Sequence, residues 1–213
     1  LKSFKSLLGN GRKLGMKISY TTQEKPKGIA DAFIIGEKFI GKSNCALILG
    51  DNIFYGQNFS EKLLSAKSRQ NGATIFSYPV HDPQRYGVVE LDKKNNPIKI
   101  VEKPKVPKSN LAVTGLYFYD NQIVNIAKSL KPSKRGELEI TDVNKVYLKN
   151  KKLYMESFGR GFAWLDTGTP ESLLTANIFI ANIEQRQGLK IACLEEITYL
   201  NKWISKLKLK KLT

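Results

Sequence analysis

The stretch that decides the fold is CALILGDNIFYG, which runs from Cys45 to Gly56. It opens with five small or branched apolar residues, and a glycine and a carboxylate, Asp51, follow directly. A continuous apolar run bounded by turn residues is typical of a central strand that is covered on both faces. Ligands of open α/β sheets bind beyond the carboxyl ends of the strands. Asp51 is therefore predicted to lie at the mouth of a binding site.

The segments around this stretch alternate between strand and helix patterns. The spacing of apolar residues predicts strands at 16–22 and 73–80, and helices at 28–41 and 60–72. Strands that alternate with helices favour a parallel, right-handed, layered α/β sheet. The first half of the chain is thus expected to form such a sheet.

The second half departs from that alternation. Two alternating runs about the polar stretch KKNNP predict a hairpin. Beyond it we expect a strand at 112–120, helices at 121–130 and 140–150, a strand pair at 153–158 and 162–168, and helices at 170–188 and 194–212. We predict a Rossmann-like, layered mixed sheet flanked by helices, with a core domain over 1–188 and a helical tail over 189–213.

The composition limits the class of protein without identifying it. The 213 residues carry a formal net charge of +16, and Arg supplies only six of the 35 basic residues. Lysines scattered in this way indicate a solvated surface, so a nucleic-acid-binding module is an alternative that rests on charge alone. No apolar run reaches the roughly 18–20 residues of a membrane span. Cys45 and Cys193 form no metal or disulfide pattern, which favours a reducing compartment, the cytoplasm.

A second carboxylate repeats the arrangement at Asp51. In FAWLDTGTP an apolar strand pattern ends at Asp166, and a threonine and a glycine follow. Two carboxylates at two strand ends are able to share one Mg²⁺, because Mg²⁺ usually takes one or two carboxylates together with substrate phosphates. The alternative for Asp51 is that it caps a turn or the next helix.

Several further polar residues fall at strand ends or helix starts. Gln23 follows a predicted strand, and an amide of this kind is able to bind the edge of a base. Glu102 and Lys103 close another strand, where they offer a carboxylate for a sugar hydroxyl and a cation for a phosphate. Each has an ordinary alternative as surface charge or core packing. Their joint placement points to a substrate site.

Six longer stretches carry a resemblance. These are QEKPKGIADAFIIGEKFIG, LGDNIFYG, DPQRYGVVELD, EKPKVPKSNLAVTGLYFYDN, LKPSKRGELEITDVN and GRGFAWLDTGTPESLLTANIFIANIEQRQG. Together they resemble the sugar-nucleotide pyrophosphorylases, and within them the glucose-1-phosphate thymidylyltransferases, from about residue 9 to about residue 196. The resemblance implies Mg²⁺-dependent nucleotidyl transfer from dTTP to glucose 1-phosphate, by in-line attack on the α-phosphorus. It also implies a homotetramer.

The resemblance also assigns roles to residues of this chain. The expected roles are Mg²⁺ binding for Asp51 and Asp166, thymine recognition for Gln23 and Gly28, sugar contacts for Tyr86, Gly87, Glu102 and Val113, sugar-phosphate binding for Lys103 and Arg135, and a pocket wall for Trp164.

One departure from the family pattern is large. The first strand and the glycine-rich loop GGxGTRLxPxT, whose backbone amides cradle a triphosphate, have no match in this sequence. We therefore expect the chain alone to be inactive and poorly soluble. Two alternatives within this fold remain open: a pyrophosphorylase for another nucleotide or sugar, and a non-catalytic subunit.

Overall fold

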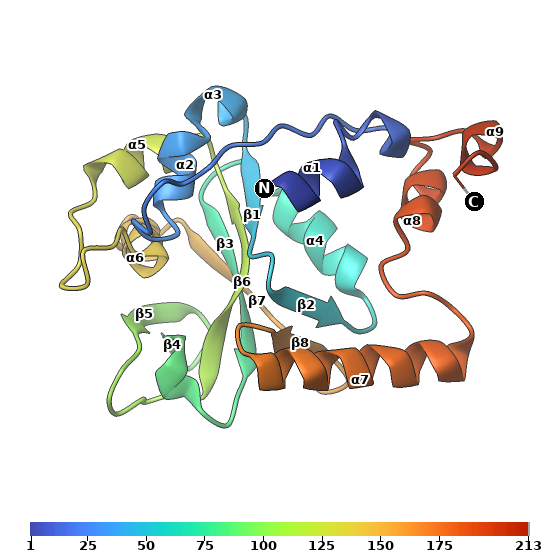
Figure 1. The fold of residues 1–213 in the computed structure, drawn as a ribbon. Coiled ribbons are helices and arrows are strands. Elements are labelled where there is room, and N and C mark those ends of the chain that lie inside the picture. Colours follow the sequence, from blue (N-terminus) through green and yellow to red (C-terminus); the bar gives the residue numbers. More distant parts are fainter. Residues whose placement is uncertain (213) are drawn as a thin grey trace. The chain divides into compact units, whose positions relative to one another are not determined.

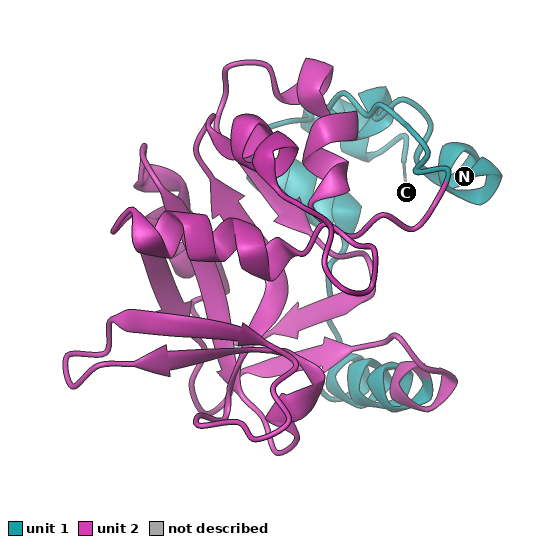
Figure 2. Cartoon of the chain, turned by 90° about the vertical axis from the view of Figure 1, so that its left-hand side faces the viewer, with its two compact units in different colours: residues 1–24, 174–213 teal, residues 25–173 magenta. Residues whose placement is uncertain are grey.

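The computed structural model describes residues 1–212, which form two compact units. One unit consists of residues 25–173, and the other combines residues 1–24 with the described residues from 174 onward (Figure 2). The domain boundary that the sequence suggests after residue 188 stays a prediction. No helix within residues 1–212 has both the length and the apolar character that crossing a membrane requires.

The larger unit is built on a six-stranded mixed sheet, which confirms the predicted fold class (Figure 1). Its strands are β1 (Cys45–Ile48), β3 (Ala73–Pro79), β4 (Gly87–Leu91), β5 (Pro97–Glu102), β6 (Leu111–Tyr119) and β7 (Leu153–Ser157). They follow the order β5-β4-β6-β3-β7, with β1 also paired to β6. The hairpin predicted around KKNNP is confirmed as β4 and β5.

Strand β6 changes neighbour along one of its edges. One edge pairs with β3 from Leu111 to Tyr119. The other edge pairs with β4 at Ala112 and with β1 from Leu116 onward. The residues between these two pairings, 113–115, have no strand beside them on that edge in the described ladders. This gap is the place in the sheet where a ligand is able to approach the backbone.

The expectation of a parallel sheet in the first half is wrong. Strands β1 and β3 both pair antiparallel with β6, and the parallel ladder of the described sheet joins β3 to β7. The segments expected as a strand pair, β7 and β8 (Ala163–Asp166), do not pair with each other. Strand β8 pairs instead with β2 (Asn52–Tyr55), the continuation of β1 beyond Asp51. Alternating patterns identify strands, but they carry no information about distant partners.

Helices cover both faces of this sheet (Figure 1). They are α2 (Asp31–Ile35), α3 (Glu37–Ile40), α4 (Phe59–Ser68), α5 (Ile123–Ser129) and α6 (Ile140–Lys149), with the short 3₁₀ turn η2 (Pro83–Arg85) ahead of β4. The single helix expected at 28–41 is two short helices, because the backbone leaves helical geometry at Gly36. Consecutive residues of β3 point to opposite faces, as β geometry requires. Ile75 joins the core under α2, α5 and α6, and Phe76 joins an aromatic core with Phe158 and Phe162.

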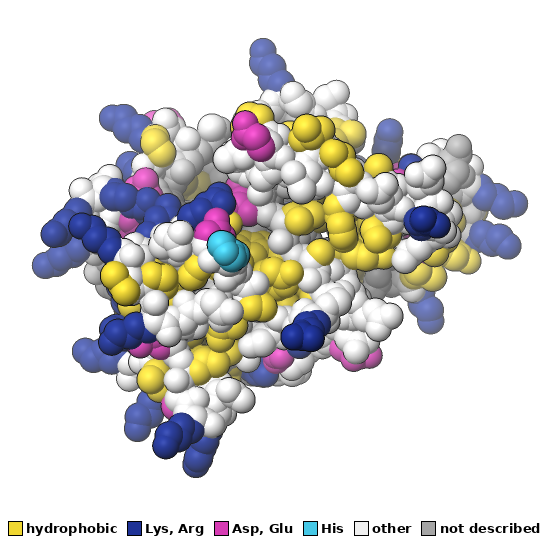
Figure 3. All heavy atoms as spheres, turned by 90° about the horizontal axis from the view of Figure 1, so that it is seen from below, with side chains coloured by type: hydrophobic (Ala, Val, Ile, Leu, Met, Phe, Trp, Pro, Cys, Tyr) yellow, Lys and Arg dark blue, Asp and Glu magenta, His cyan; other side chains and the backbone are white. Residues whose placement is uncertain are grey.

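The second unit is helical. It contains α1 (Lys2–Leu8), the turn η1 (Arg12–Leu14), most of α7 (Pro170–Gln187), α8 (Leu194–Leu200) and α9 (Lys206–Leu209). The strand expected at 16–22 is wrong, because these residues have irregular backbone and join no strand ladder within the described chain. The helix expected at 194–212 is interrupted between α8 and α9. Thr213, the last residue of the predicted tail domain, lies outside the described residues. On the face drawn in Figure 3, Lys and Arg side chains lie in separate groups.

Candidate functional site

A cavity of about 650 Å³ opens where β6 changes neighbour. Its walls come from the ends of β1, β5 and β8, from the starts of β4 and α6, and from the middle of β6. Most of the residues singled out in the sequence line it: Asp51, Tyr86, Gly87, Glu102, Lys103, Val113, Arg135, Trp164 and Asp166. The predicted gathering of strand-end residues around one site is therefore found in the structure.

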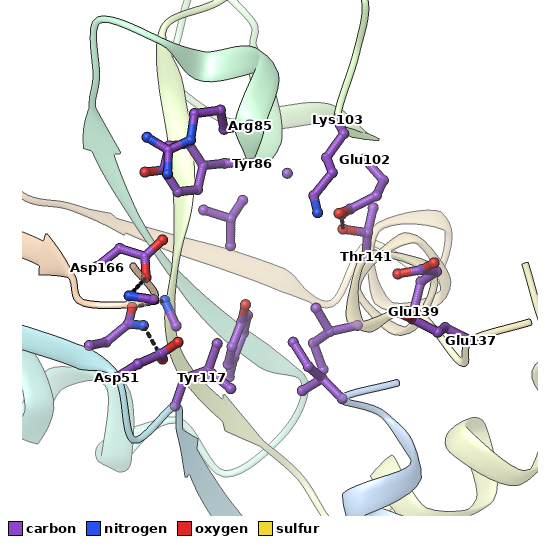
Figure 4. Close-up of a pocket in the computed structure, with 18 of the residues that line it drawn as sticks. Asp51, Arg85, Tyr86, Glu102, Lys103, Tyr117, Glu137, Glu139, Thr141 and Asp166 are labelled. Atoms are coloured by element: carbon purple, nitrogen blue, oxygen red, sulfur yellow. Dashed lines mark hydrogen bonds between the residues drawn. The ribbon is translucent and has the colours of Figure 1, made fainter. Parts of the chain in front are cut away.

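The carboxylates of Asp51 and Asp166 lie at one end of this cavity (Figure 4). Antiparallel pairing of β2 with β8 places Asp166 opposite Asn52, next to Asp51. A β-carbon added to Gly168 would lie 3.3 Å from Oδ1 of Asp166 and 3.8 Å from Oδ2 of Asp51. Both carboxylates therefore reach the same small space beside the Gly168 backbone.

This pair fits a divalent cation that is also bound by a substrate. Within residues 1–212 no group of three or more His, Cys, Asp or Glu is arranged to hold a metal ion. Two carboxylates are nevertheless a usual protein share for Mg²⁺, which takes further oxygen ligands from water and phosphates. The loops that carry the pair are joined, because the backbone N–H and the hydroxyl of Thr167 each donate a 2.8 Å hydrogen bond to the carbonyl oxygen of Asp51.

At the other end of the cavity, Glu102 faces the start of α6 (Figure 4). The hydroxyl of Thr141 donates a short hydrogen bond to Oε2 of Glu102. A β-carbon on Gly87 would lie 3.1 Å from this hydroxyl, 3.4 Å from the same carboxylate oxygen and 3.9 Å from Cβ of Val113. These residues thus form a small polar niche in which a carboxylate and backbone atoms are available to hydroxyl groups.

Lys103 follows Glu102 in the chain, and its backbone conformation is rare for a lysine. Its φ angle is +42°, a left-handed conformation that costs a side chain of this size about 1–3 kcal/mol. Its backbone N–H donates a 3.0 Å hydrogen bond to the carbonyl oxygen of Tyr86, which fixes the end of β5. The side chain points into the cavity and forms no ion pair with a carboxylate of the described chain.

Arg135 also lines the cavity, but its charge is already balanced. Its guanidinium donates hydrogen bonds to both carboxylate oxygens of Glu139, and Glu137 lies 3.4 Å away. Burial alone would raise the pKa of Glu139, but hydrogen bonds from Arg135 and Ser133 outweigh burial, and the pKa of this carboxyl is lowered. The same hydrogen bond to Glu139 raises the pKa of Arg135. An anion at this place would therefore compete with Glu139 for the guanidinium.

Aromatic rings form one wall of the cavity. The rings of Tyr86 and Trp164 lie 5.1 Å apart, and the ring of Tyr78 lies 6.0 Å from that of Trp164. Burial is the largest cause of a raised pKa for the Tyr86 hydroxyl. The Nε1–H group of Trp164 donates a 2.7 Å hydrogen bond to Oδ1 of Asn52. Trp164 is therefore held as a fixed wall with an apolar face.

Two of the sequence-predicted residues are not among those that line the cavity. Gln23 belongs to the other compact unit, and its predicted role stays a prediction. Gly28 packs against the backbone of Leu138, while its neighbour Ile29 does line the cavity.

The cavity also contains side chains to which sequence reasoning gave no individual role. They are Asn52, Arg85, Tyr117, Glu137, Glu139 and Thr141. Asn52, Arg85 and Glu137 lie within one or two positions of a predicted residue, and Glu139 and Thr141 follow Arg135 in the stretch RGELEIT. Their nearness in sequence was the available signal, but only the turn geometry shows which of them face the cavity.

Comparison with known proteins gives a consistent result. Residues 1–183 match a family described as nucleotidyl transferase. The chain is 55% identical over 210 residues, 99% of its length, to a glucose-1-phosphate thymidylyltransferase of Neisseria meningitidis, of which it covers 73%. It is 51% identical over 209 residues, 98% of its length, to the protein of the same name from Xanthomonas campestris, of which it covers 71%.

Solved structures show the same similarity. A crystal structure assigned as a glucose-1-phosphate thymidylyltransferase from Bacillus anthracis, in complex with sucrose, matches with a TM-score of 0.74 and 41% identity. That match covers 84% of this chain and 71% of the other. A UDP-glucose pyrophosphorylase complexed with UDP-glucose matches with a TM-score of 0.68 and 25% identity, over 85% of this chain and 74% of the other.

Proposed function

The chain belongs to the nucleotidyl transferase family, among the glucose-1-phosphate thymidylyltransferases, and we propose that its cavity joins dTTP to glucose 1-phosphate. In this reaction an oxygen of the sugar phosphate bonds to the α-phosphorus of dTTP, and the bond from that phosphorus to the pyrophosphate oxygen breaks. The products are dTDP-glucose and pyrophosphate. The observation that supports this most is that one cavity contains a carboxylate pair and, at its opposite end, a niche for sugar hydroxyls.

In this proposal Asp51 and Asp166 hold Mg²⁺, which when bound neutralises charge on the phosphate oxygens of the nucleotide. The contribution of the chain is to keep both carboxylates beside the same face of Gly168. Positioning of this kind accounts for most of the catalysis in phosphoryl-type transfers, because little covalent chemistry is needed from the protein.

The niche around Glu102 is the proposed sugar site. The Thr141 hydroxyl donates its hydrogen bond to Oε2 of Glu102, so Oε1 is left to accept hydrogen bonds from sugar hydroxyls. The backbones of Gly87 and Val113 border the same niche and present groups for further hydroxyls. The ring of Trp164 lines the cavity that contains both this niche and the carboxylate pair.

Lys103 and Arg135 are the proposed ligands of the sugar phosphate. Lys103 is available to an anion, because its ammonium group forms no ion pair in the described chain. Glu139 competes with the phosphate for the guanidinium of Arg135. The two cations hold the attacking phosphate in place and lower its repulsion from the nucleotide phosphates.

The remaining expectations are carried forward as parts of the proposal. Gln23 and Gly28 recognise thymine, and the protein works in the cytoplasm as a homotetramer. Apolar side chains exposed on α7, Leu174 at 61% and Ile178 at 55%, support association between copies. Sedimentation velocity tests the tetramer, and a monomer at micromolar concentration would contradict it.

The decisive test is pyrophosphate release from dTTP and glucose 1-phosphate. Because the sequence has no match to the glycine-rich loop, the assay uses both the 213-residue chain and the same chain preceded by a family loop segment. Release that requires dTTP supports the proposal, and a preference for UTP would replace thymidylyl by uridylyl transfer. No release from either protein would overturn it. Glu102→Gln should abolish most of the activity, and Glu90→Gln in the same hairpin is the matched control.

A further inference from the structure

Asn52 connects the parts of the site more extensively than any assigned residue does. Its Oδ1 accepts two hydrogen bonds, from the backbone N–H of Gly115 at 2.9 Å and from Nε1–H of Trp164 at 2.7 Å. Its Nδ2 donates a 2.8 Å hydrogen bond to Oδ1 of Asp51. One side chain thus joins the central strand, the aromatic wall and a proposed cation ligand.

The chemistry of its partners fixes the orientation of this amide. A backbone N–H and an indole N–H only donate, so both must face the amide oxygen of Asn52. The amide NH₂ is then directed away from them, toward Asp51. A reversed amide would place two donors against donors and an oxygen against a carboxylate. The donation to Asp51 therefore follows from the two other bonds.

The sheet explains why a side chain is needed here. Backbone pairing along this edge of β6 ends at Leu49, whose N–H donates to the carbonyl oxygen of Gly115. The chain then turns, and the N–H of Gly115 is left without a backbone partner, so the Asn52 oxygen takes it. A β-carbon on Gly115 would lie 2.6 Å from this oxygen. A glycine is therefore required at position 115 for Asn52 to fit.

We propose that Asn52 is a positioning residue that holds Oδ1 of Asp51, so that Oδ2 is the oxygen presented to the cation and substrate. The observed geometry supports this assignment. Oδ1 accepts from Asn52, while Oδ2 lies 3.8 Å from the position of a β-carbon on Gly168, which itself lies 3.3 Å from Oδ1 of Asp166. The cation part rests on the proposed function, and the hydrogen bond itself does not.

The first test exchanges the hydrogen-bond donor at position 52 and the acceptor at position 51. It measures thermal stability, so it needs no metal. In Asn52→Asp, the new carboxylate still accepts from Gly115 and Trp164, but its second oxygen faces Asp51. We expect the melting temperature to fall by about 5 °C, because like charges replace a charge-assisted hydrogen bond. The double variant Asp51→Asn with Asn52→Asp restores a donor–acceptor pair and should return to within about 2 °C of wild type.

Each result of this exchange decides for or against the contact. Recovery in the double variant supports it, as does folding of the double variant when Asn52→Asp alone does not fold. Additive losses, or failure of both proteins to fold, would overturn it. Asp51→Asn alone provides the fourth corner of the cycle.

The second test measures Mn²⁺ binding by titration calorimetry and reports on the positioning. Asn52→Asp should weaken Mn²⁺ binding about tenfold. Trp164→Phe, which removes the indole donor and keeps Asn52, should change it less than about twofold. Equal losses in both variants would indicate a merely structural role, and tighter binding by Asn52→Asp would also overturn the positioning role. If the wild type binds no Mn²⁺, the cation part of the proposed function fails, while the exchange test still decides the contact.

Discussion

The guanidinium of Arg135 donates to both carboxylate oxygens of Glu139, at 2.8 Å and 3.0 Å from one nitrogen, and both residues line the cavity. Nε of Arg135 and the hydroxyl of Ser133 donate two further hydrogen bonds to the same carboxylate, at 3.2 Å and 2.7 Å. The cation assigned to the sugar phosphate is thus paired internally in the structure. Glu139 thus competes with a bound anion for the guanidinium, so its carboxylate should lower the affinity of the site for anions.

Replacement of Glu139 by Gln should tighten binding of glucose 1-phosphate. Arg135 would keep its charge, and the phosphate would no longer compete with a carboxylate for the guanidinium. We expect the Kd to fall about threefold, which is the size of effect typical of one partly exposed ion pair. Titration calorimetry at fixed ionic strength measures this. Glu90→Gln is the control, since it changes the net charge equally and its carboxylate pairs with Lys99 instead. Equal tightening in both variants would indicate a long-range charge effect, and weaker binding would show that Glu139 organises Arg135.

Gly168→Ala should impair cation binding without unfolding the protein. The added methyl group would lie 3.3 Å from Asp166 and 3.8 Å from Asp51, in the space that their oxygens share. We expect Mn²⁺ affinity to fall about tenfold, as for loss of a well-placed neighbour of a metal ligand. Gly159→Ala is the control, because no atom lies within 4 Å of its new methyl group. Unchanged Mn²⁺ affinity in Gly168→Ala would place the cation elsewhere.

The residues that line the cavity were easier to predict from the sequence than the pairing of strands in the sheet. Asp51 and Asp166 were found because a carboxylate directly after an apolar strand is a local pattern, and strand ends gather at one place. Strand partners are set by distant packing, so the antiparallel pairing of β1 with β6 and the pairing of β2 with β8 were not visible in the sequence. Asn52 was missed for a related reason. Its role depends on Gly115 and Trp164, which are 63 and 112 positions away.

Cys45 should be unreactive toward alkylating reagents near neutral pH. Burial, followed by the charge of Asp120, raises the pKa of its thiol to about 11 from an ordinary value of 9.0. At pH 8 the reactive thiolate is then about a hundredfold rarer than in the unfolded chain. Because the pKa is raised, this thiol favours the folded state below about pH 9, and that contribution is lost as the pH rises toward 11.

Iodoacetamide labelling followed by mass spectrometry measures this in a Cys193→Ser background, in which Cys45 is the remaining cysteine. Labelling should be slow at pH 8 and should accelerate up to about pH 11, and at each pH below 11 it should be faster in urea than in the native protein. Rapid native labelling at pH 8 would contradict the raised pKa that partial burial and the charge of Asp120 give Cys45.

Tyr147→Phe should destabilise the larger unit through a single lost hydrogen bond. The hydroxyl of Tyr147 donates a 2.7 Å hydrogen bond to Oδ1 of Asp120, and both residues are buried. Asp120 also accepts from the N–H of Gly72 at 2.7 Å, so its carboxylate joins the start of β3 to α6. A hydrogen bond to a buried charged group contributes about 1.5–3 kcal/mol, and we expect the free energy of unfolding to fall by that amount.

Urea denaturation measures this loss in the free energy of unfolding, with one dependence on urea concentration fitted to all variants. The control is Tyr154→Phe on β7, whose exposed ring keeps its contact with Arg69 when the hydroxyl is removed. Its cost should stay within about 0.5 kcal/mol, as for other surface substitutions. If Tyr147→Phe costs no more than this control, the two backbone donors of Asp120, at Gly72 and Gln122, satisfy its charge without the tyrosine. The link from α6 to this carboxylate would then contribute packing alone.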